Sequence, residues 1–405
     1  MAIYKYKGKN KAGNLIEGER VARSPQEVIS TLEKEAIQVL SVEKKKIQMQ
    51  LPFTTAGGFQ RKKVTLRELS VFNRQLSVMF NAGLPITQGL GILGTQQQNK
   101  YFQEVISEVR KDVESGSNLS NALRKHPRVF NELYCSMIQA GEASGSLDTI
   151  LLRLSQYIEN MTRLTAKVKS AMAYPIAVLI MAVVITSVIL WKVVPIFKGM
   201  FDQLGAGLPI PTQIIMSISE FLQGNFFFVL IGIGILTFAF RSYYATFGGR
   251  RVIDRIKLKL WIFGPLLLKL GVARVTRTLS TLLNAGVEII EGITITAKTS
   301  GNAIIEDSVL KSRSSVQEGK PLWESWEEAK IFPFMVTQMV SVGEQTGSLS
   351  TMLGKIADFY DEEVETAVTA LIAVMEPILI LILGGLVGSI IVAMYLPMFD
   401  IIGRV

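Results

Sequence analysis

Three long apolar stretches separate the polar segments of this chain. They lie at Ala177 to Val194, Phe221 to Phe240 and Ile378 to Leu396. About 20 mostly apolar helical residues are enough to cross a hydrocarbon core of about 30 Å. We therefore expect transmembrane helices over residues 174–196, 221–240 and 374–396, with a short loop over 197–220 and a tail over 397–405.

The polar sequence before the first and third stretches has the periodicity of short amphipathic helices. Thr65 and Glu68 form a capping box, and Leu69, Phe72 and Leu76 follow at helical spacing. The same reasoning predicts helices at Ile86 to Gln97, Phe102 to Glu114, Leu119 to Lys125, Glu132 to Ala140 and Leu147 to Val168. We expect an all-helical module over residues 64–173 and another over 241–373.

The first 43 residues have a different pattern. Alternating positions predict strands at Ala2 to Lys7, through Val21, and at Ile37 to Val42, and Ser24 is placed to cap a helix between the last two. Residues 1–43 are thus expected to form a small α/β domain in the cytoplasm, and 44–63 a basic linker rich in Lys, Arg, Pro and Gly.

The chain contains an internal duplication. Arg74 to Gly89 reads RQLSVMFNAGLPITQG, and Arg277 to Gly292 reads RTLSTLLNAGVEIIEG. A second matching motif, Gly-Glu-x-Ser/Thr-Gly-Ser-Leu, occurs at Gly141 to Leu147 and at Gly343 to Leu349. Each copy is followed by an apolar stretch between two prolines. The expected fold class is therefore mainly α: two repeated cytoplasmic all-helical bundle modules and three transmembrane helices, preceded by the α/β unit.

The distribution of basic residues predicts the orientation in the membrane. Lys and Arg gather before the first span and after the second, whereas Lys198 and Arg404 are the only basic residues in the loop and the tail. Basic flanks face the cytoplasm, so we expect a multi-pass protein with a cytoplasmic N-terminus and no cleaved signal peptide. We interpret the net charge of +9 as basic residues beside the spans that are attracted to anionic lipid headgroups, and we expect no nucleic-acid partner.

The sequence offers little for catalysis. It has one cysteine, Cys135, and one histidine, His126, so a histidine-dependent triad, a metal cluster and a disulfide are not expected. Gly319-Lys320 lacks the spacing of a nucleotide-binding loop. The acidic run at Asp361 to Glu365 is interpreted as a solvated helix face. We expect no enzyme activity, cofactor or metal.

The repeated motifs supply the candidate partner-binding residues, and two interpretations stay open. The motif glycines permit tight turns, Ser146 and Ser348 are placed to cap the next helix, and the glutamates can accept backbone N–H bonds or face a partner. The motif is thus either a structural turn or a turn that also shapes a partner surface. The candidates are Asn81, Gly83, Glu142, Gly145, Asn284, Gly286, Glu344 and Gly347.

The third span carries three further candidates. Gly384 and Gly388 form a Gly-x-x-x-Gly step that allows a second helix to approach closely. Glu376 lies at the mouth of the same span, where it serves either as an interfacial anchor or as a functional carboxylate.

From residue 64 onward the duplicated NAGL/NAGV and GExxGSL motifs, each with its proline-bracketed span, resemble the PilC and GspF group of inner-membrane platform proteins. The N-terminal unit resembles the extra domain of that group. The resemblance implies a non-catalytic bacterial inner-membrane platform, as a homodimer, that couples a cytoplasmic hexameric ATPase to insertion of pilin or pseudopilin into a fibre. A retraction ATPase and other inner-membrane assembly proteins are further implied partners.

Several functions compete with this interpretation. The look of the N-terminal unit and the NAGLPI run favour pilus assembly, with type II protein secretion as the alternative. Glu288 stands where the first copy has Pro85, which indicates that the two copies differ in their partners. A small transporter is a third hypothesis, disfavoured because the spans have little polarity at their centres. A membrane-bound enzyme is a fourth, disfavoured because no nucleophile, base and oxyanion donors can be assembled.

Overall fold

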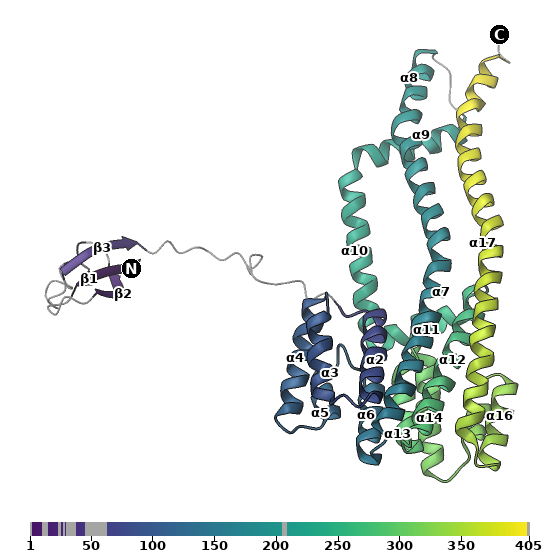
Figure 1. Cartoon of the computed structure of the whole chain (residues 1–405). Coiled ribbons are helices and arrows are strands. Elements are labelled where there is room, and N and C mark those ends of the chain that lie inside the picture. Colours follow the sequence, from purple (N-terminus) through teal and green to yellow (C-terminus); the bar gives the residue numbers. More distant parts are fainter. Residues whose placement is uncertain are drawn as a thin grey trace. The chain divides into compact units, whose positions relative to one another are not determined.

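The computed structural model describes residues 2–9, 15–22, 26, 29, 38–44, 63–204 and 209–402, which belong to two units, 1–61 and 62–405 (Figure 1). The first unit is a three-stranded antiparallel sheet of order β2-β1-β3, with β1 at Ala2–Lys9, β2 at Leu15–Ala22 and β3 at Gln38–Lys44. Of the expected helix after Ser24 only Gln26 and Ile29 are described, both as helical, and nearly all of the expected linker over 44–63 lies outside the described residues.

The second unit begins with the first helical module. It contains α2 (Leu66–Asn81), α3 (Ile86–Gln96), α4 (Lys100–Glu114), α5 (Leu119–Arg124), α6 (Glu132–Ser144) and the first half of α7 (Leu147–Val188). The capping box that begins α2 is confirmed: Glu68 N donates to Thr65 Oγ1 at 3.2 Å, and Thr65 N donates to Glu68 Oε2 at 2.7 Å. These two bonds satisfy donors that the first helical turn leaves free.

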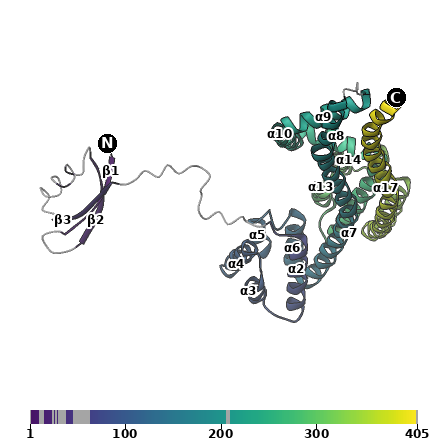
Figure 2. The same cartoon turned by 90° about the horizontal axis from the view of Figure 1, so that it is seen from above.

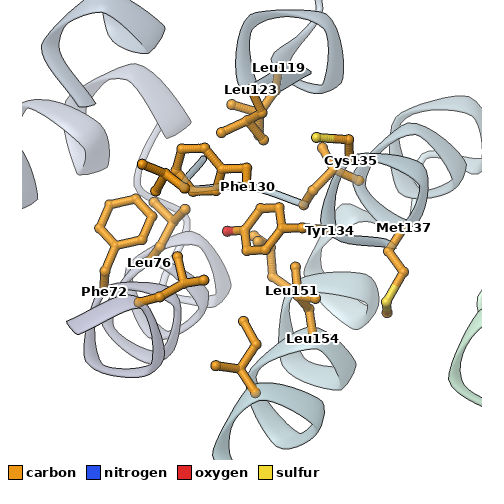
Figure 3. Packing of buried hydrophobic residues seen from close by; sticks show 14 of the residues in the cluster. Phe72, Leu76, Leu119, Leu123, Phe130, Tyr134, Cys135, Met137, Leu151 and Leu154 are labelled. Carbon is orange, nitrogen blue, oxygen red and sulfur yellow. The ribbon is translucent and has the colours of Figure 1, made fainter. Parts of the chain in front are cut away.

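The core of the first module is built around aromatic rings (Figure 3), and it also contains a buried chain of hydrogen bonds. The Phe72 and Phe102 ring centroids lie 5.2 Å apart, and those of Phe130 and Tyr134 lie 5.0 Å apart. Tyr134 donates its hydroxyl to Asn73 Oδ1 at 2.7 Å, and Asn73 Nδ2 donates to the Leu151 carbonyl. Burial raises the pKa of Tyr134, which therefore stays a neutral donor. These two hydrogen bonds fix how α2, α6 and α7 pack together.

The second module repeats this plan. It contains α11 (Phe247–Lys259), α12 (Phe263–Asn284), α13 (Ile289–Thr299), α14 (Ala303–Gln317), α15 (Leu322–Glu328), α16 (Phe334–Gln345) and the first part of α17 (Leu349–Ile402). Its own core surrounds Trp326, whose ring stacks on Phe332 at 4.2 Å. The expected fold class, with repeated helical modules and three candidate membrane helices, is confirmed.

The first and third candidate membrane helices continue directly from the modules. The helix α7 passes through a π-helical turn at Ile189–Val193 into α8 (Val194–Leu204), and α17 continues unbroken to Ile402. The two helices run alongside each other in both views (Figures 1 and 2), and they pack through Met161, Leu164, Val364 and Val368. Both leave the modules in the same direction.

The second span begins later than the sequence predicts. We expected a helix over residues 221–240, but α9 (Ile210–Gly224) ends at Gly224 and a new helix, α10 (Phe226–Ala245), begins after Asn225. Glycine and asparagine are common where helices end, and they interrupt the apolar run here. Phe221 therefore belongs to α9, which packs against α17 through Met216, Ile390 and Met394.

A buried carboxylate joins α11 to α14 within the second module. Asp254 Oδ2 accepts the Ala303 N–H at 3.0 Å, where α14 begins, and Asp254 Oδ1 accepts from Lys257 and Tyr244. Burial alone raises the pKa of Asp254, but these hydrogen bonds outweigh burial and lower the pKa below the ordinary value of 3.8. Since α10 leads into α11, this carboxylate also positions the second span.

We expect Asp254→Asn to lower the melting temperature of the purified protein at neutral pH, because the ionised carboxylate makes these bonds better than an amide does. A carboxyl group with a lowered folded-state pKa stabilises above its unfolded value and loses that contribution as the pH falls. The difference between wild type and variant should therefore shrink as the pH falls below 3.8. Exposed Asp148, changed to Asn, is the control. A pH-independent difference would contradict the prediction.

Candidate functional site

The two GExxGSL motifs occupy equivalent places in the two modules, and their glutamates make equivalent bonds. Glu142, in the last turn of α6, accepts the Leu119 N–H at 2.6 Å and the Ser120 N–H at 3.2 Å. Glu344, in the last turn of α16, accepts the Leu322 N–H at 2.7 Å and the Trp323 N–H at 3.1 Å. Each carboxylate thus caps the beginning of the short preceding helix, α5 or α15.

These caps come from a neighbouring helix because the local residues supply none. Asn118 precedes α5 and Pro321 precedes α15, and neither makes a side-chain bond to its own helix. A carboxylate at a helix N-terminus satisfies free N–H groups and lies at the positive end of the helix dipole. The motif was interpreted either as a structural turn or as a turn that also shapes a partner surface. The structure shows the bonds from the glutamates to backbone N–H groups that a structural turn requires. The partner-facing role of the glutamates stays a prediction.

The motif glycines have two separate tasks. Gly145 and Gly347 both have a φ of +68°, in the left-handed region that favours glycine, and they end α6 and α16. Gly141 is required for close packing instead, since an added Cβ would lie 3.0 Å from Ile150 Cγ1. Gly343 is equally close to Met352 and Leu349. Our candidate residues omitted Gly141 and Gly343, although glycine at this position in both copies of the motif indicated that the position is constrained.

The expected serine caps are not formed as predicted. Ser146 occupies the position before α7, but its hydroxyl makes no capping bond and lies 2.7 Å from Ser144 Oγ. The Ser348 hydroxyl lies 2.6 Å from Thr346 Oγ1 in the same arrangement. Because a second hydroxyl lies two residues earlier, on the other side of the turn glycine, the serine hydroxyl bonds to it and not to the N–H groups of the next helix.

The NAG motifs end equivalent helices. Asn81 is the last residue of α2 and Asn284 the last of α12, and Gly83 and Gly286 both have a φ of +85°. Pro85 and Glu288 both stand directly before the next helix, so this sequence difference leaves the turn unchanged.

The surroundings of the two NAG motifs differ. Arg153 of α7 donates to the Asn284 carbonyl, and the Tyr157 hydroxyl lies 3.2 Å from Thr278 Oγ1. These contacts form a seam between the two modules beside a cavity of about 350 Å³, which Arg153, Tyr157 and Asn284 help to line. Asn81, Gly83, Asn284 and Gly286 are all exposed, but among the described residues only the Asn284 carbonyl accepts a bond from the other module.

The acidic run of α17 is not the solvated face that we expected. Arg277 donates to Asp358 Oδ1 at 2.8 Å and to Asp361 Oδ2 at 2.7 Å, and the Asp361 side chain is only 13% exposed. Burial lowers the pKa of Arg277, but these two bonds outweigh burial and raise it. The equivalent pair in the first module is Arg74 and Glu159, at 3.3 Å. The signal for this pair was the arginine found in both copies.

Two further acids of that run also have cationic partners. Lys269 Nζ lies 2.6 Å from Glu363 Oε2, and Lys167 of α7 pairs with Glu365. The second pair joins α7 to α17 close to the start of the apolar stretches. One exposed ion pair therefore joins the two long helices where they leave the modules, beside their apolar packing.

The membrane candidates lie on open faces of α17. Glu376 is exposed, and a Cβ added at Gly384 or Gly388 would meet nothing within 4 Å. No group of three or more His, Cys, Asp or Glu side chains is placed to hold a metal ion among the residues that the structure describes.

We expect Glu142→Ala and Glu344→Ala each to destabilise their own module by about 1–3 kcal/mol, because two backbone donors lose their acceptor. Each 1 kcal/mol should lower the melting temperature of the purified protein by about 2–4 °C. The measurement is thermal unfolding followed by circular dichroism in mild detergent. The matched control is Glu104→Ala, which removes an exposed carboxylate from the middle of α4. Equal melting temperatures for Glu142→Ala and Glu104→Ala would contradict the capping role.

Comparisons with known proteins agree with this arrangement. The family model "Type II secretion system (T2SS), protein F" matches residues 72–195 and 275–397, one match for each repeat, and the model for the N-terminal domain of that protein matches residues 1–43.

Relatives match over nearly their whole length. The type IV pilus assembly protein PilC of Myxococcus xanthus is 41% identical over 100% of this chain and 96% of its own. PilC of Thermus thermophilus is 40% identical over 100% and 99%, respectively. The type II secretion system protein F of Vibrio cholerae is 31% identical over 99% and 98%. The chain therefore belongs to the type II secretion system protein F family, which its PilC-like relatives share.

Proposed function

We propose that this protein is the non-catalytic inner-membrane platform of a type IV pilus assembly machine. It couples a cytoplasmic hexameric ATPase to the insertion of pilin subunits from the membrane into the fibre. The observation that carries the proposal is the identity of 40–41% to PilC proteins along the whole chain, against 31% to a protein F of type II secretion.

The proposed orientation puts the N-terminus and both helical modules in the cytoplasm of a bacterium. It is supported by the basic residues beside the ends of the spans, including Arg163, Lys167 and Arg250. With this orientation the modules are accessible to a soluble motor. The loop and the C-terminal tail are on the opposite side, where the fibre is built.

Continuous helices supply the coupling in this proposal. The 54 residues of α17 span about 80 Å at 1.5 Å per residue, from the core of the second module through the apolar stretch. A helix whose first half is fixed in a packed core transmits a movement of that core along its length. Pilin, other inner-membrane assembly proteins and a second copy of this chain would lie beside the spans, where Glu376, Gly384 and Gly388 offer open faces.

The proposed seat of the assembly ATPase is formed by the turns at the two GExxGSL motifs, and a retraction ATPase would use the same surface. Glu142, Gly145, Glu344 and Gly347 shape these turns. Asn81, Gly83, Asn284 and Gly286 shape the NAG turns at the same ends of the modules, because α2 and α12 run antiparallel to α7 and α17. The exposed motif residues Ala143 and Gln345 would then contact the motor.

A second candidate function is the platform of a type II secretion system, which would act on pseudopilins. It is favoured by the description of the matching family model and by the 31% identity to the Vibrio cholerae protein. The two functions require different fibres and are separated by the phenotype.

Deletion of the gene should abolish surface pili and twitching motility, with secretion of exoproteins unchanged. Electron microscopy, a motility assay and analysis of the culture supernatant measure these outcomes. Lost secretion with intact pili would establish the second candidate, and no change in either would refute both. Restoring the gene on a plasmid is the control.

The double substitution Ala143→Arg and Gln345→Arg should reduce copurification of the ATPase with the tagged protein at least tenfold. Both positions are exposed, and the glutamate caps remain in place, so the modules should stay folded. Glu104→Arg, an exposed change on α4, is the control and should retain the ATPase. Full retention by the double variant would reject this surface as the seat of the motor.

A further inference from the structure

The two modules are not packed reciprocally. The second module contributes the tip of its α12–α13 hairpin to the seam. Leu282, Ala285, Val287 and Ile295 join the core cluster of the first module, and each is at most 9% exposed. We name these four positions, together with the NAG turn, the hairpin face.

The hairpin face of the first module is free. Its equivalent residues are Met79, Ala82, Leu84 and Ile92; Ala82 is exposed and the others are half-buried. If a two-fold axis related the modules, both copies of the hairpin face would be buried. Since only one is buried, the modules are packed head to tail.

The opposite side of the seam belongs to α6 and α7 of the first module. Met137 is fully buried and points away from Phe130 and the other rings of its own core (Figure 3), and α6 packs against α12 and α13. Arg153 and Tyr157 make the polar contacts to α12 described above. We name Met137, Arg153 and Tyr157 the receiving face.

The receiving face of the second module is also free. Met339 is equivalent to Met137 and is half-buried. Lys355 is equivalent to Arg153 and is exposed, and Phe359 is equivalent to Tyr157 and is 44% exposed. Within the described part of the chain, Lys355 has no hydrogen-bond or ion-pair partner.

The two free faces retain the chemistry of the seam. Arg153 donates to a carbonyl at the C-terminal end of α12, where the helix dipole favours a cation. Lys355 carries the same charge as Arg153, and Asn81 ends α2 as Asn284 ends α12. An aromatic residue, Tyr157 or Phe359, follows each cation by one helical turn. A free hairpin face and a free receiving face on one molecule therefore match each other.

We propose that a second copy of this chain fills these faces, so that the hairpin face of the first module in one copy packs on the receiving face of the second module in the other. Lys355 of one copy then donates to the Asn81 carbonyl of the other. Because α7 and α17 leave the modules in the same direction, repeating the relation between modules keeps all spans in one bilayer. The inference rests on the proposed function, because it specifies the contact through which two copies of the proposed platform form a homodimer.

The test is crosslinking between chains in native membranes. Asn81→Cys and Lys355→Cys are placed in separate copies with different tags, coexpressed, and treated with a short bis-maleimide. We expect a product that carries both tags and that neither variant gives alone. Native Cys135 is buried, and burial raises its pKa to about 11, so it should not react.

The matched control uses the seam within one chain. Arg153→Cys with Asn284→Cys should crosslink intramolecularly and keep the mass of a monomer, which shows that the reagent spans this contact. Adding Ala82→Arg to the Asn81→Cys copy should abolish the two-tag product, whereas adding Glu104→Arg should not. A product from Asn81→Cys alone would show a two-fold contact and overturn the proposal, as would no two-tag product when the control reacts.

Failure here is distinguishable from failure of the proposed function. Absence of the crosslink in cells that still need the gene for pili would reject this contact and leave the platform function in place. Pili that form without the gene would reject the function whatever the crosslink shows.

Discussion

Each module of this protein is tied to the membrane because its last helix continues beyond the module. In α7, Leu151 and Leu154 are fully buried in the core of the first module, and the same helix then carries the first apolar stretch. In α17, Leu353 and Ile356 do the same for the second module. Burial of the first half of a helix thus fixes the direction of the second half, and the remaining contacts position the modules around these two helices.

The duplication kept the contacts that hold a module together and changed those between modules. The carboxylate cap, the left-handed glycines and an arginine–carboxylate pair, between α2 and α7 or between α12 and α17, occur in both copies. In the seam, the hairpin face comes only from the second module and the receiving face only from the first. Equivalent residues of the two modules therefore have different neighbours. Identity at a position does not by itself indicate a task within a module, because Ala285 and Ile295 of the seam are identical in the first copy. The change from Val71 to Arg274 lies beside the seam.

The sequence predicts features that depend on near neighbours and misses those that depend on distant ones. The Thr65 capping box, the helices of the first module and the membrane helices follow from local spacing and hydropathy. The caps from Glu142 and Glu344 join residues more than 20 positions apart, and the Arg277–Asp361 pair joins residues 84 apart. Only the tertiary structure brings these groups together, which is why the acidic run was misread and the glutamates were left with two interpretations.

The two modules are joined to different spans, so the seam between the modules is the decisive element for coupling their movements. The first module is joined to α7, whereas the second is joined to α17 directly and to α10 through Asp254 and the Arg251–Asp307 pair. The seam is packed by the hairpin face and crossed by the Arg153 and Tyr157 bonds beside a cavity, and α7 and α17 are packed through apolar side chains and the Lys167–Glu365 pair where they leave the modules. The two modules and their spans are therefore joined at the seam and at the packed region of α7 and α17, and a movement of one module reaches the spans of the other through these contacts.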